Sequence, residues 1–172
     1  MAHSLGPSVT VGSAGTQAAA GQAADPRMQP FFPDLSMEGF VARQVGEELI
    51  EEADLILTMT RAHRAYVLAL VPSAVRRTFA LLDFAKWLSV AEPDELPGAT
   101  PAERLLAAIA SVPDLRARAP RRRSASCDIP DPFGSNPATY RVVAKKIHEA
   151  TDQIAAALAP PRRVADGGQR PE

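Results

Sequence analysis

Short apolar runs alternate along this chain with segments whose apolar positions recur every three or four residues. The two clearest runs are Leu55 to Met59 and Thr78 to Leu82, and their lack of alternation is typical of parallel strands covered on both faces. A shorter run at Val9 to Val11 predicts a further strand. Strands that alternate with helices favour an α/β fold, here a three-layer α/β/α arrangement around a small parallel sheet.

The two best-defined helices are marked by capping residues as well as by periodicity. Thr60 is placed to cap a helix over 61–70, and Asn136, followed by Pro137, is placed to open the longest helix. The apolar stripe of that long helix recurs at spacings of three and four and predicts a face turned to the core. Its members are Tyr140, Val143, Ile147, Ala150, Ile154 and Leu158.

Other helices are predicted with shorter or less regular patterns. Thr100 and Glu103 form a capping box, and the helix after them is expected to end near Ala110. Asp83 is expected to cap the helix that carries Trp87, and a brief helix is expected after Asp25. Two short helical pieces, separated at Gly46, are expected between residues 36 and 52.

Composition narrows the classes of function. The 172 residues carry 19 Lys and Arg against 20 Asp and Glu, so no overall field favours nucleic acid or an acidic membrane as a partner. The only cysteine, Cys127, excludes an internal disulfide and fits a reducing compartment. Because the sequence shows neither a membrane-spanning apolar run nor a secretory signal, we expect a cytoplasmic protein.

Cofactor and metal sites are not indicated by the sequence. His3, His63 and His148 have no metal-ligand spacing, and the glycines do not form a nucleotide-binding loop. A basic stretch from Arg116 to Arg123 is compatible with a docking site for phosphate or nucleic acid. We favour a solvated linker, since no aromatic residue is interleaved with these arginines.

The segment from Asp128 to Gly134 is the best candidate for chemistry. Pro130 and Pro132 restrict the backbone, so Asp131 is expected on a stiff, non-helical loop with Phe133 two residues later. A carboxyl group fixed beside a ring suits a proton donor to an aryl leaving group. The same residues are also typical of a tight turn before the next helix, and spacing alone favours the turn.

Five motifs in order along the chain resemble those of low-molecular-weight protein tyrosine phosphatases, and the chain looks like an actinobacterial-type member. The motifs are Ser13-Ala14-Gly15-Thr16, Asp25-Pro26-Arg27, Ala42-Arg43-Gln44, Ala53-Asp54-Leu55-Ile56-Leu57-Thr58-Met59 and Asp131-Pro132-Phe133-Gly134. The resemblance covers roughly residues 5 to 158. The predicted domain is therefore 1–158, followed by a disordered tail at 159–172.

The resemblance implies a fold, a reaction and two site residues. The family has a four-stranded parallel sheet and a Cys-x5-Arg-Ser/Thr phosphate loop after its first strand, and the loop cysteine forms a phosphocysteine intermediate. Asp131 would protonate the leaving phenolate and then activate water, and Phe133 would stack on the substrate ring. The implied substrate is a phosphotyrosine protein or a small aryl phosphate, with no metal or other cofactor.

The phosphate loop itself is absent from the 172 residues. Cys127 is followed by Phe133 where the arginine of Cys-x5-Arg would stand, so it is not the family nucleophile. We expect the central first strand to be missing from the sheet and the chain to be inactive as written. The alternative is a non-catalytic binding or regulatory module, and an in-frame start upstream of Met1 is the simplest source of the missing part.

Two further departures from the family affect the substrate slot. Ala18, Ala19 and Ala20 stand where the family often has a large aromatic residue, and Phe40 stands where a histidine commonly supports the phosphate loop. A one-walled slot is expected to grip phosphotyrosine less firmly and to leave room for another aryl phosphate. Arsenate reduction is disfavoured, because it requires additional cysteines.

Overall fold

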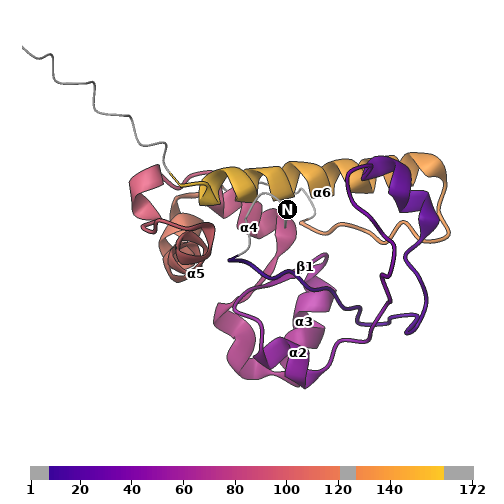
Figure 1. Ribbon diagram of the computed structural model, residues 1–172. Coiled ribbons are helices and arrows are strands. Elements are labelled where there is room, and N and C mark those ends of the chain that lie inside the picture. The colour runs from indigo at the N-terminus through magenta and orange to yellow at the C-terminus, as the bar shows by residue number, and fades with distance from the viewer. Residues whose placement is uncertain (1–7, 121–126, 161–172) are drawn as a thin grey trace, which may run out of the picture.

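A two-stranded parallel sheet lies between two layers of helices in the computed structural model, which describes residues 8–120 and 127–160 (Figure 1). In chain order, the elements are η1 (Pro26–Phe31), α2 (Glu47–Glu51), β1 (Ile56–Thr58), α3 (Arg61–Leu70), η2 (Pro72–Arg76), β2 (Thr78–Ala80), α4 (Leu81–Leu88), η3 (Pro93–Glu95), α5 (Pro101–Arg118) and α6 (Pro137–Leu158). The η elements are 3-10 helices.

Strand β1 shows why helices cover both faces of the sheet. Successive side chains of a strand point to opposite faces. Leu55 and Leu57 pack against the larger core, which α4, α5 and α6 supply, whereas Ile56 packs against the smaller core formed with α2 and α3. The three-layer α/β/α architecture predicted from the sequence is therefore confirmed.

Helix α4 is the centre of the larger core. Its residues Leu81, Phe84, Ala85 and Leu88 are buried, and it packs against both α5 and α6 (Figure 1). The ring of Phe84 also stacks on Phe79 of β2, with 5.4 Å between the centroids. A short helix with so much apolar surface is stable because its neighbours cover nearly all of it.

The open edge of β1 is the main feature of the sheet. Ile56 N–H donates to the Arg77 carbonyl at 2.8 Å, on the side of β2. Because backbone groups alternate between the two edges of a strand, those of Leu57 face away from β2. Within residues 8–120 and 127–160, no backbone hydrogen bond joins Leu57 to another element. This edge is therefore unpaired in the described part of the chain.

The strand predicted at Val9 to Val11 does not form, and that prediction was wrong. These residues are extended without ladder pairing, although Val9 packs against the larger core. The parallel bridge nearest to them in the described sequence joins Gly15 to Gln44. A strand is stabilised by its neighbour, and no strand among the described residues pairs with Val9 to Val11.

Several helix boundaries also differ from the expectation. Only α2 forms between residues 36 and 52, because the earlier stretch makes turns and backbone bonds with residues 15 to 22. Helix α4 begins at Leu81, so Asp83 lies in its first turn and is not its cap. Helix α5 continues through Pro113 to Arg118, because the buried positions Val112 and Leu115 extend its core face.

The two best-marked helices agree with their prediction. Thr60 accepts a hydrogen bond from His63 N–H and caps α3, and Asn136 accepts one from Thr139 N–H and caps α6. Helix α6 ends at Leu158, and five of its six predicted stripe residues are buried, Ile147 being half-buried. Arg121 to Arg123 and most of the predicted tail lie outside the described residues.

Candidate active site

The loop before α6 is attached to the carboxyl end of β1. Ile129 N–H donates to the Met59 carbonyl at 2.8 Å, and the Ile129 side chain is only 2% exposed. Asp128 Oδ1 accepts a 2.8 Å hydrogen bond from Arg61 N–H, at the first turn of α3. The loop therefore meets the edge of the sheet at which α/β proteins bind their ligands.

Asp131 lies in a tight turn just beyond these anchors. Its Oδ1 accepts a 2.9 Å hydrogen bond from Phe133 N–H, and the Pro132 carbonyl accepts one from Ser135 N–H. Gly134 has φ of 75°, a left-handed conformation that suits glycine. The turn predicted from the sequence is confirmed. It leaves the Asp131 carboxyl group exposed to solvent.

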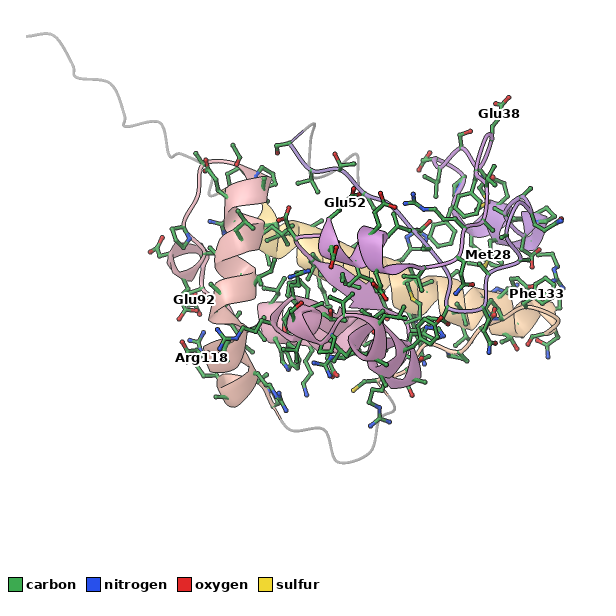
Figure 2. The ribbon with its side chains drawn as sticks, turned by 90° about the horizontal axis from the view of Figure 1, so that it is seen from below. Met28, Glu38, Glu52, Glu92, Arg118 and Phe133 are labelled. Atoms are coloured by element: carbon green, nitrogen blue, oxygen red, sulfur yellow. The ribbon has the colours of Figure 1, made fainter. Side chains whose placement is uncertain are left out.

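The ring of Phe133 is the most exposed large apolar side chain described, at 74%. Figure 2 shows it at the start of α6, on the same side of the molecule as Met28 of η1. The guanidinium carbon of Arg27 lies 5.5 Å from the Phe133 centroid and 4.8 Å from that of Tyr140. Residues from η1 and α6 thus meet beside Asp131.

Asp25 connects these two elements. It forms a 2.8 Å ion pair with Arg27, and its Oδ2 accepts a 2.6 Å hydrogen bond from the Tyr140 hydroxyl. The hydrogen bond from Arg27, and then that from Tyr140, hold the pKa of Asp25 well below its usual value. Burial, followed by the contact with Asp25, raises the pKa of Tyr140, which therefore stays a donor.

Cys127 is at the other end of the same loop, close to Asp83 in α4. The hydrogen bond with Asp83, together with burial, raises the pKa of the Cys127 thiol. A cysteine nucleophile requires the opposite shift, because the thiolate is the reactive form. This environment supports the expectation that Cys127 is not the nucleophile of a phosphatase.

An apolar hollow of about 270 Å³ lies between the Ser13 to Gly15 loop and the stretch that contains Phe40 and Arg43. Ala18 and Phe40 line it together, so the two departures from the family pattern share one surface. Arg43 Nε donates to the Ser13 carbonyl at 2.8 Å and holds the two segments together. Among the described residues, no hydrogen bond or ion pair joins this lining to Asp131.

Metal-binding clusters and helices able to span a membrane are both absent from residues 8–120 and 127–160. In that part of the chain, no group of three or more His, Cys, Asp or Glu side chains is placed to hold a metal ion. Nor does any described helix have the length and apolar character needed to cross a membrane.

The sequence pointed to Asp131 and Phe133 but not to their neighbours. Asp25 and Arg27 belong to a motif that carried the family resemblance, yet no role was attached to them. Tyr140 was placed on the core face of α6 without a polar partner. The 115-residue separation between Asp25 and Tyr140 explains this, since no local pattern reports such a contact.

Two solved structures to which this chain is similar are those of phosphatases. A structure of the tyrosine phosphatase Wzb from Escherichia coli K30 in complex with sulphate matches 90% of this chain and 82% of its own, with 19% identity and a TM-score of 0.61. The YwlE arginine phosphatase from Geobacillus stearothermophilus matches 88% of this chain and 75% of its own, with 22% identity and a TM-score of 0.60. At these identities, the likeness establishes the fold alone.

Sequence comparison assigns the family. Residues 1–97 match the family described as low molecular weight phosphotyrosine protein phosphatase, and the chain belongs to that family. Wzb of Salmonella typhi, a low molecular weight protein-tyrosine-phosphatase, is 42% identical over 91 residues, which are 51% of this chain and 59% of that relative. The chain thus spans little more than half the length of this relative, and Asp131 lies beyond the family match.

Proposed function

We propose that this chain carries the acid and base half of a protein tyrosine phosphatase site, with Asp131 as the acid and base and Phe133 as the platform for the substrate ring. In its complete form it would hydrolyse phosphotyrosine monoesters. The observation that carries the proposal is the attachment of the Asp131 loop to the carboxyl end of β1 through Ile129 and to the first turn of α3 through Asp128. Family membership supplies the class of reaction.

The proposed reaction has two steps, and Asp131 acts in both. A cysteine thiolate attacks phosphorus, the bond from phosphorus to the aryl oxygen breaks, and Asp131 gives its proton to that oxygen. The Asp131 carboxylate then takes a proton from water as the water oxygen attacks phosphorus. The bond from phosphorus to sulfur breaks, which releases phosphate and restores the thiolate.

The nucleophile for this reaction is not among the 172 residues. Cys127 is the only cysteine, and it does not begin a Cys-x5-Arg sequence because Phe133 occupies the sixth position after it. The raised pKa of the Cys127 thiol also disfavours attack on phosphorus. We therefore propose that the 172-residue chain, by itself, does not hydrolyse aryl phosphates.

The open edge of β1 is the place at which a nucleophile can be supplied. Its unpaired backbone groups at Leu57 suit an additional parallel strand. A strand here would end at the same edge of the sheet as β1, close to the Asp131 loop. A phosphate loop that follows such a strand would bring its cysteine to the acid and base already in place.

The substrate class follows from the same surfaces. An exposed ring at Phe133 suits an aryl group, so a phosphotyrosine protein or a small aryl phosphate is the proposed substrate. The hollow lined by Ala18 and Phe40 offers no polar side chain other than Ser13 and Arg43. The single cysteine in the sequence fits a cytoplasmic setting for this proposed enzyme.

The test joins a strand followed by Cys-x5-Arg-Ser and a short helix to the N-terminus of the chain. We expect the extended protein to hydrolyse phenyl phosphate and the 172-residue chain not to do so. In the extended protein, Asp131→Asn should lower kcat about 10²- to 10⁴-fold for phenyl phosphate. The loss should be smaller for p-nitrophenyl phosphate, because its phenolate leaves with less need of a proton.

Asp152→Asn on the exposed face of α6 is the matched control and should leave kcat unchanged. A folded extended protein without turnover would contradict the proposal and favour a non-catalytic binding or regulatory module. Turnover that does not depend on Asp131 would contradict the role given to that residue.

A further inference from the structure

The Arg27 side chain is held in place by the Asp25 carboxylate. Its Nη2 and Nε donate to the Asp25 carboxylate, at 2.8 Å and 3.0 Å, so the planar guanidinium is gripped at two points. Asp25 in turn caps η1 through Arg27 N–H and accepts the hydroxyl proton of Tyr140, a side chain only 2% exposed. The guanidinium is therefore fixed relative to α6.

The ring of Phe133 has much less support of its own. It is 74% exposed, and among the described residues only Arg27 makes a cation or ring contact with it, at 5.5 Å. The same guanidinium lies 4.8 Å from the ring of Tyr140, which α6 holds rigidly. Arg27 therefore connects an exposed ring on a turn with a buried ring of the core.

We infer that Arg27 is a positioning residue, which holds the Phe133 ring in place for the aryl group of the substrate. This inference rests on the proposed role of Phe133 as the substrate platform. One face of Phe133 would contact the guanidinium, and the remaining exposed surface of the ring would be available to the substrate. A positioning residue of this kind acts when the substrate binds. Its loss should therefore weaken substrate binding and leave the rate of the chemical step unchanged.

The geometry requires arginine rather than any cation. A planar guanidinium can bind a carboxylate at two points and lie over aromatic rings, whereas the ammonium of lysine is a point charge on a flexible stem. Arg27→Lys retains the positive charge but should lose the two-point contact with Asp25. The Phe133 ring should then no longer be held in place. Arg141→Lys makes the same change on the exposed face of α6 and is the matched control.

The first experiment uses the 172-residue chain and needs no activity. Protons of a side chain above an aromatic ring are shifted upfield in NMR spectra. We expect Phe133→Leu to move the Arg27 side-chain resonances downfield, and Arg27→Lys to move the Phe133 ring resonances toward the values of an unstructured peptide. Arg141→Lys should change neither. Unchanged Arg27 resonances in the Phe133→Leu protein would overturn the contact and the inference.

The second experiment uses the extended, Cys-containing protein. Arg27→Lys should raise KM for phenyl phosphate about two- to fivefold, as expected for an exposed cation and ring contact, with kcat unchanged. Phe133→Ala should raise KM at least as much. A KM that rises in Phe133→Ala but not in Arg27→Lys would overturn the inference alone. A KM unchanged in both, or no turnover at all, would overturn the proposed function and the inference with it.

Discussion

Replacement of Asp128 by alanine tests whether the first turn of α3, which follows β1, holds the Asp131 loop in place. Asp128 Oδ1 accepts a 2.8 Å hydrogen bond from Arg61 N–H, and its side chain is 33% exposed. A hydrogen bond to a charged group contributes about 1.5–3 kcal/mol when buried, and a charge at a helix N-terminus about 0.3–1 kcal/mol when exposed. For this partly exposed site we expect Asp128→Ala to lower the free energy of unfolding by about 1–2 kcal/mol.

The side-chain ion pair of Asp128 adds little to that estimate. The distance from Arg61 Nε to Asp128 Oδ1 is 3.6 Å, and the Arg61 side chain is 70% exposed, so water screens the pair. Asp128→Asn keeps an oxygen acceptor and should lose less stability than Asp128→Ala. The difference between the two variants therefore separates the loss of charge from the loss of the acceptor.

The assay is urea denaturation, combined with hydrogen exchange at the Ile129 amide. Asp128→Ala should lower the urea midpoint without changing the m value, and should speed exchange at Ile129, whose N–H is bonded to Met59. Asp152→Ala, on the exposed face of α6, should change neither measurement. Stability within about 0.3 kcal/mol of the parent, with unchanged Ile129 exchange, would refute the anchoring role.

Three further predictions follow from single sites. Asp25 has a lowered pKa, so its contribution to stability is complete above about pH 4, the pKa of the unfolded state, and is lost as the pH falls below that value. The difference in melting temperature between the parent and Asp25→Asn should therefore narrow in acid. A difference that stays constant with pH would contradict this prediction. Asp83→Asn should speed alkylation of Cys127 by iodoacetamide at pH 8, because Asp83 raises the pKa of that thiol, and an unchanged rate would argue against the contact. Gly98→Ala should lower the free energy of unfolding by about 1–3 kcal/mol, since φ is 143° and the added Cβ would lie 2.6 Å from a neighbouring side-chain carbon. Gly46→Ala, whose added Cβ meets no other atom, should lower it less in the same thermal melts.

Local sequence signals predicted the elements that depend on local contacts. Helix α3 begins after Thr60 and ends at Leu70 as expected, and α6 begins at Pro137 after its Asn136 cap. In both cases the capping side chain bonds to a backbone N–H only three residues away, so the information lies within one turn.

Elements that depend on distant partners were predicted less well. The run at Val9 to Val11 has the pattern of a strand but lacks ladder partners among the described residues. The turn around Asp131 was predicted because proline and glycine determine it locally. The position of Arg27 over Phe133 was not, because the contact joins η1 to the loop before α6 and requires the whole fold.

Turnover of phenyl phosphate by the 172-residue chain and its Asp131→Ala variant is the decisive measurement of whether this chain contains its own nucleophile. We expect no turnover above background in either protein, because neither contains a Cys-x5-Arg loop. Clear turnover by the parent chain that Asp131→Ala abolishes would contradict the claim that this chain lacks the nucleophile of its own site.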